Sequence, residues 1–119
     1  MSDTPKVTAL EENVWVYLKP GPPPVYRVHP SPKAVKKLKS LTFINLTDKE
    51  VKVKGKSSSN VQILDPDELT IPAWTDRAAA PPSKTAAATE NLGAHQYKIQ
   101  VGGNDWAQGG SDPDIIIDP

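Results

Sequence analysis

The chain has 119 residues, which suits one domain with one core, and it contains no cysteine, so disulfides, thiolate metal sites and cysteine nucleophiles are excluded. Its 14 basic and 14 acidic side chains cancel at pH 7, and its 13 prolines indicate many turns and strand ends. Residues 1–18 lack the apolar run of a signal peptide, and no stretch approaches the ~20 apolar residues of a membrane span. We therefore expect a cytoplasmic protein that does not bind membranes.

The N-terminal residues 1–13 are polar, and we expect them to form a flexible segment before a single domain at residues 14–119. Residues 14–18 are dense in β-branched and aromatic side chains, which predicts a strand with Trp15 in the core. The proline-rich run after residue 19 ends this strand, and residues 25–29 form a second one.

Further β-like segments follow at intervals set by turn signals. They cover residues 40–45, 51–54, 61–64, 69–72, 95–101 and 115–117. Alternation in two of them predicts which side chains are buried: Val51 and Val53 face the core while Lys52 and Lys54 face solvent. Of the three consecutive isoleucines at 115–117, not all can face one side, so we expect two in the core.

Two segments have no single interpretation from the pattern. In residues 34–39, Val35 and Leu38 are three apart, which fits a short helix, but a basic connection into a strand fits equally well. Residues 75–92 form an alanine- and proline-rich insert. It is compatible with a short helix over residues 83–91, capped by Ser83 and ended at Gly93, or with a mobile insert.

The regular spacing predicts an all-β fold, a Greek-key β-sandwich of about seven or eight strands. The order of segments over residues 25–119 resembles cupredoxin-like β-sandwiches. The resemblance rests on a strand that ends at Asn45, followed by residues 51–53, 61–72, 93–103 and 112–117. Immunoglobulin-like sandwiches share these patterns, so both topologies stay open.

The resemblance does not extend to a metal site. Blue-copper cupredoxins hold copper with two histidines, a cysteine thiolate and usually an axial methionine. This chain has no cysteine, and its only methionine is Met1. The resemblance therefore implies a version without copper, and we expect no cofactor.

Residues suited to catalysis are scarce. The only histidines, His29 and His95, lie at strand ends, and we expect both at the surface. Serines 57–59 lack the tight Gly-x-Ser-x-Gly turn of a nucleophile, and the paired glycines lie between strands instead of leading into a helix. We therefore predict a protein that is not an enzyme.

Two acceptor-rich motifs have other interpretations. The carboxylates Asp105, Asp112 and Asp114 have oxygens that suit calcium, although an acidic loop with Asx-turns explains them equally simply. The alternative function is thus a calcium-dependent or other oxygen-ligated metal domain, or an enzyme subunit. Residues 45–47 match the glycosylation pattern Asn-Leu-Thr, which has no consequence in a cytoplasmic protein.

The charges are unevenly distributed along the chain. Residues 19–56 carry ten basic and two acidic side chains, whereas residues 57–119 carry three basic and nine acidic ones. We predict a non-catalytic binding or accessory module whose partner is a protein, either acidic or a second copy of the chain. The candidate contact residues are Lys49, Lys52, Lys54, Lys56 and the loop aromatic Trp106.

Two alternatives to this interpretation depend on the lysines and their surroundings. Strands also use lysine for solubility and to protect sheet edges, and the acidic half would then only balance the charge within one molecule. Nucleic acid is a less favoured partner because Phe43 is the only aromatic side chain near these lysines that could stack on a base.

Overall fold

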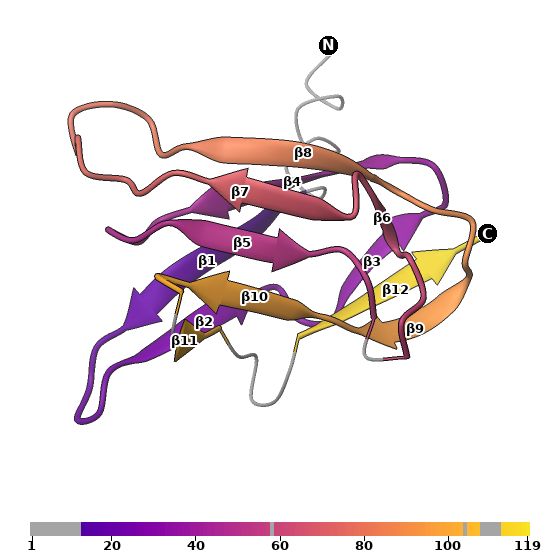
Figure 1. Cartoon of the computed structure of the whole chain (residues 1–119), viewed down its shortest axis with the longest axis horizontal. Coiled ribbons are helices and arrows are strands. Elements are labelled where there is room, and N and C mark those ends of the chain that lie inside the picture. Colours follow the sequence, from indigo (N-terminus) through magenta and orange to yellow (C-terminus); the bar gives the residue numbers. More distant parts are fainter. Residues whose placement is uncertain (1–12, 58, 104, 108–112) are drawn as a thin grey trace, which may run out of the picture.

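A computed structural model describes residues 13–57, 59–103, 105–107 and 113–119. As predicted, the fold is all-β: the described residues form twelve strands and no helix (Figure 1). The predicted flexible segment lies outside the described residues except for Asn13, which begins the first strand.

The strands form three sheets. In spatial order, the five-stranded sheet contains β2 (Val25–His29), β1 (Asn13–Lys19), β4 (Ser40–Asn45), β8 (Ser83–Ala88) and β6 (Leu64–Asp65). The four-stranded sheet contains β11 (Asp105–Trp106), β10 (Lys98–Val101), β5 (Val51–Lys54) and β7 (Glu68–Ile71). The three-stranded sheet contains β3 (Lys33–Lys36), β12 (Asp114–Asp118) and β9 (Gly93–Gln96). Strand pairs β1–β4 and β3–β12 are parallel, and the other pairs are antiparallel.

The strand count exceeds the expected seven or eight because four strands come from segments with weak β patterns. The helix considered for residues 83–91 is wrong: β8 pairs with β4 over five residues, and Ala86 and Ala88 alternate into the core. Pairing between strands overrides the helix propensity of alanine here. The helix considered for residues 34–39 is also wrong, since β3 pairs with β12 and Leu38 adopts a positive φ of 65° in the turn that follows.

The remaining two extra strands come from the C-terminal third. The single strand expected at residues 95–101 is divided, with β9 pairing to β12 and β10 pairing to β5. The short strand β11 then pairs with β10, so Trp106 belongs to a strand and not to a loop.

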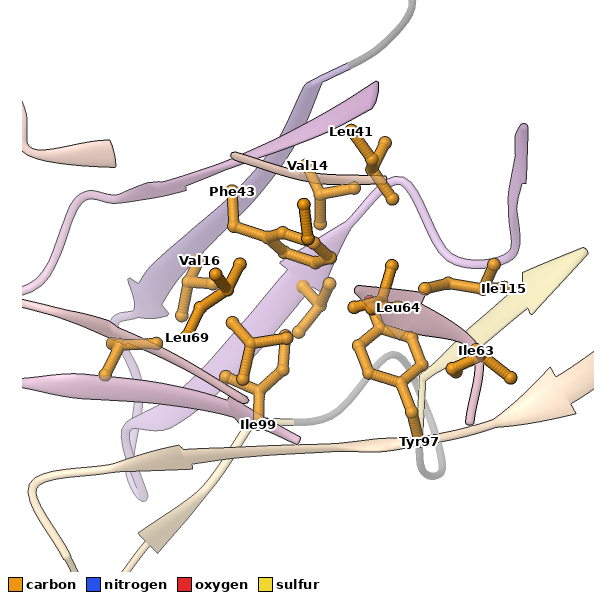
Figure 2. Packing of buried hydrophobic residues seen from close by; sticks show 14 of the residues in the cluster. Val14, Val16, Leu41, Phe43, Ile63, Leu64, Leu69, Tyr97, Ile99 and Ile115 are labelled. Carbon is orange, nitrogen blue, oxygen red and sulfur yellow. The ribbon is translucent and has the colours of Figure 1, made fainter. Parts of the chain in front are cut away.

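All three sheets contribute to one apolar core (Figure 2). Its members include Val14, Val16, Leu41 and Phe43 from the five-stranded sheet, Val51, Val53, Leu69, Ile71, Ile99 and Val101 from the four-stranded sheet, and Val35, Ile115 and Ile117 from the three-stranded sheet. Two of the three consecutive isoleucines are buried, as predicted. The core position predicted for Trp15 is wrong, because the period of two places Val14 and Val16 inside and leaves Trp15 half-buried on the other face of β1.

Candidate functional site: the outer face of the four-stranded sheet

The candidate residues on β5 and β11 lie on one surface. Gln100 of β10 pairs with Trp106 on one side and with Lys52 on the other. Residues directly opposite one another in neighbouring strands point to the same face of a sheet. Trp106, Gln100 and Lys52 therefore form a row across the strands, and Lys98 and Lys54 form the adjacent row. We call these five residues the Trp106 face.

The Trp106 face looks outward because the alternating residues are buried. Val51 and Val53 are fully buried, which confirms the orientation predicted for β5 from its sequence. On β10, Ile99 and Val101 are likewise fully buried, so Lys98 and Gln100 lie on the solvent side with the β5 lysines.

The aromatic ring of this face carries a cation. The Nζ atom of Lys98 lies 5.4 Å from the centroid of the Trp106 ring, within the range of a cation–π interaction. The tryptophan remains 44% exposed, which is unusual for so large an apolar side chain. Trp106 is thus an accessible aromatic surface beside positive charge.

One lysine of the face is matched by a carboxylate. The Nζ atom of Lys54 lies 3.0 Å from Oε1 of Glu68 on β7, and this hydrogen bond together with the lysine charge lowers the pKa of the Glu68 carboxyl below its ordinary value. Within the described residues, Lys52 has no ion pair. The two β5 lysines therefore differ in availability to a partner.

Lys49 and Lys56 flank the face at opposite ends of β5. The aliphatic stem of Lys49 packs on Gly102, where an added Cβ would lie 2.8 Å from the lysine Cδ. The Nζ atom of Lys56 lies 3.9 Å from Oδ2 of Asp67, an exposed pair that contributes little to stability. The structure thus places Lys52, Lys54 and Trp106 together and the other two candidate lysines at the margins.

Lys98 and Gln100 are members of the face that the sequence analysis did not single out. Their alternation with Ile99 and Val101 was a usable signal for an outward orientation. Their position between β5 and β11, however, depends on strand register, which the sequence does not state.

The remaining candidates for chemistry have structural roles or lie apart. The Oγ atom of Ser57 accepts hydrogen bonds from the backbone N–H groups of Ser59 and Val61, which orders the loop after β5. The Nε2 atom of His95 lies 2.8 Å from the carbonyl oxygen of Asn91. Of the three aspartates considered for calcium, Asp112 lies outside the described residues. Among the residues that are described, no group of three or more His, Cys, Asp or Glu is arranged to hold a metal ion.

No protein-family model, no curated protein and no solved structure matches this chain. Within the part of the chain that the structure describes, no helix has the length and apolar character that a membrane crossing requires. Function is therefore inferred from the residues of this chain.

Proposed function

We propose that this protein is a non-catalytic binding module that uses the Trp106 face to associate with an acidic segment of a partner protein. The observation that carries the proposal is the accessible Trp106 ring, which lies beside Lys98 and one residue pair away from Lys52. Exposed tryptophans are frequent energetic anchors of protein interfaces, and surrounding charges orient the partner.

The position of β5 argues against edge protection as the reason for its lysines. The strand lies between β10 and β7, so its backbone hydrogen bonds are already used on both sides. Lysines on such a strand do not block the addition of further strands. Solubility remains a sufficient explanation for the lysines alone, but not for the exposed Trp106 among them.

The lysines are also held close to one another. Lys98 lies directly opposite Lys54, an arrangement of like charges that is unfavourable in a sheet. Glu68 beside Lys54 and the Trp106 ring beside Lys98 offset this repulsion. An acidic partner would reduce it further, which supports the choice of a partner with carboxylates.

A charge-reversed variant tests the proposal. The tagged protein and the double variant Lys52→Glu/Trp106→Ala are used to capture partners from the native lysate, at low salt and at about 150 mM salt, where the screening length is about 8 Å. We expect the parent chain to retain an acidic protein whose recovery falls with salt, and the double variant to lose it. The control is Lys37→Glu/Leu92→Ala, which changes one exposed lysine and one exposed apolar side chain outside the face.

Three results decide the outcome. If the double variant keeps every captured protein while both variants remain folded, the Trp106 face is not the contact surface. If the partner is lost equally in the control variant, charge at large and not the face is responsible. If no other protein is retained and sedimentation shows self-association that only the face variant abolishes, the partner is a second copy of the chain.

We also propose that the sandwich is cupredoxin-like and serves without copper. In support, the segments that carry the resemblance form β4, β5, β7, β10 and β12. Addition of Cu(II) should give no intense thiolate-to-copper absorption band, because the chain has no cysteine. A crystal structure in which these strands do not follow the cupredoxin connectivity would contradict the proposed topology.

A further inference from the structure

A polar groove lies on the outer face of β1 and β2, in the five-stranded sheet and apart from the Trp106 face. Its volume is about 450 Å³, and its walls are formed by Tyr17, Lys19, Arg27, Val28, His29 and Ser31. Tyr17 pairs directly with Arg27, and the neighbouring Val16 and Val28 pair in the core. The tyrosine and arginine side chains therefore share the outer face.

The groove presents hydrogen-bond donors without an acidic side chain. Its polar walls offer a phenol, an ammonium, a guanidinium, an imidazole and a hydroxyl. Neither Lys19 nor Arg27 forms an ion pair with any described residue. These properties favour an anion over a cation or a neutral ligand.

Arg27 provides a second, independent observation. Its Nε atom is buried, yet it has no hydrogen-bond partner among the described residues. A buried donor without an acceptor is unfavourable, and native structures leave few of them. An acceptor bound in the groove would satisfy this donor, and the guanidinium edge suits the two oxygens of an oxyanion.

Ser31 adds a donor at the wall. Its Oγ atom accepts a hydrogen bond from the backbone N–H of Asp114 at 3.1 Å, so the hydroxyl proton stays available for a ligand. Together with Tyr17, Lys19, Arg27 and His29, this makes more donors than the two oxygens of one carboxylate readily use. Three oxygens of a phosphate group match the set better.

We propose that this groove binds a phosphate group, either as inorganic phosphate or as the monoester of a small organic molecule. The groove volume lies in the range of small-ligand sites and leaves room for an organic portion next to the phosphate. The proposal does not depend on the Trp106 face, because the two surfaces belong to different sheets.

Amide chemical shifts in ¹⁵N-labelled protein test the proposal. The protein is titrated separately with inorganic phosphate, phenyl phosphate and benzoate, at constant ionic strength. We expect saturable shifts at Tyr17, Arg27, His29 and Ser31 with both phosphates and only weak shifts with benzoate. Stronger binding of phenyl phosphate would assign the ligand as an ester, and equal binding would assign it as free phosphate.

Matched variants separate the groove from charge in general. Arg27→Gln should weaken phosphate binding at least tenfold, and Arg27→Lys should restore only part of it because lysine lacks the paired donors. Lys19→Gln removes an exposed cation of the groove and should also weaken binding, so the test does not depend on the stability of the Arg27 variants. Lys37→Gln removes an exposed charge elsewhere and should have no effect.

The proposal is overturned by any of three results: shifts that spread over surface lysines without saturation, phosphate affinity unchanged in both Arg27→Gln and Lys19→Gln, or benzoate binding as tight as that of phenyl phosphate.

Discussion

Asn45 and Tyr97 are both completely buried in this small domain, yet they satisfy their polar atoms in opposite ways. The Asn45 amide uses its full hydrogen-bonding capacity, with two donations and two acceptances. The Tyr97 hydroxyl has no partner among the described residues. Equal burial therefore does not imply an equal contribution to stability, because the free energy depends on what each polar atom contacts.

The surroundings of Asn45 explain its value. Its Nδ2 group donates to the carbonyl oxygens of Lys49 and Pro72, at 2.8 and 2.9 Å, and its Oδ1 atom accepts from the N–H and the hydroxyl of Thr47. Asn45 ends β4, Lys49 precedes β5 and Pro72 follows β7. One amide thus connects the five-stranded sheet to the four-stranded sheet.

The surroundings of Tyr97 are apolar. Its ring meets Phe43 in an edge-to-face contact, with centroids 6.3 Å apart and planes at 71° (Figure 2). Its backbone N–H donates to the carbonyl oxygen of Pro113, next to β12. Tyr97 therefore contributes through its ring, which packs beside the strand that carries Ile115 and Ile117.

The largest expected effect comes from removing the strand beside Tyr97. Deletion of residues 114–119 removes β12, the central strand of the three-stranded sheet, together with the buried Ile115 and Ile117. Burial of the two isoleucines alone corresponds to about 3–6 kcal/mol, a large part of the stability of a typical domain. Denaturant unfolding should show a protein that is unfolded or nearly so in water. An unchanged midpoint would mean that this strand contributes no core packing.

Asn45→Ala should be the most damaging single polar substitution. It leaves the Pro72 carbonyl oxygen without its side-chain donor and Thr47 without its acceptor, so we expect a loss of about 2–4 kcal/mol in the free energy of unfolding. Asn91→Ala is the control, because the Asn91 amide also donates to a carbonyl oxygen but at an exposed position.

Asn45→Asp distinguishes hydrogen bonding from shape. Aspartate keeps the size and the accepting oxygen but replaces the donor that faces two carbonyl oxygens. It should therefore destabilise about as much as alanine. If Asn45→Asp is neutral at pH 7, the two donated hydrogen bonds are not the source of the stability.

The alternating strands and two buried isoleucines could be predicted from the sequence because the period of two is a local signal. The partners of Asn45 could not, since Pro72 lies 27 residues away and is brought close only by the fold. The alanines of β8 were misleading for the same reason, because their pairing with β4 is non-local.

The candidate sites show the same division. The outward orientation of Lys52 and Lys54 follows from alternation, but their proximity to Trp106 depends on the register between β5, β10 and β11. The groove at Arg27 depends on the pairing of β1 with β2, and no short motif marks it.

Alkaline titration should reveal Tyr97 specifically. Burial raises the pKa of its phenol above the ordinary value, and the negative charge of Asp114 raises it further. Between the unfolded pKa of about 10 and the raised folded value, the unfolded chain loses a proton that the folded chain keeps. The free energy of unfolding should therefore fall with rising pH, with this residue contributing about 1.4 kcal/mol per pH unit.

Denaturant unfolding at pH 8, 10 and 11 measures this effect, with Tyr97→Phe as the reference (the pH values are chosen to bracket the phenol range near 10). Lysines titrate in the same interval, so the informative quantity is the difference between the parent chain and the variant. That difference should grow above pH 10. Parallel pH profiles for the two proteins would show that the buried phenol ionises as readily as it does in the unfolded chain.

The smallest effect is expected for Tyr97→Phe at neutral pH, although the residue is among the largest fully buried ones. The variant keeps the ring and its contact with Phe43 and removes only a hydroxyl that has no partner among the described residues. Removing an unsatisfied buried polar atom is neutral or stabilising, so the unfolding free energy should change by less than about 1 kcal/mol. Tyr97→Leu, which also removes the aromatic contact, should cost more. A loss above about 2 kcal/mol for Tyr97→Phe would show that the hydroxyl is hydrogen-bonded in the folded protein, and the contrast with Asn45 would then no longer hold.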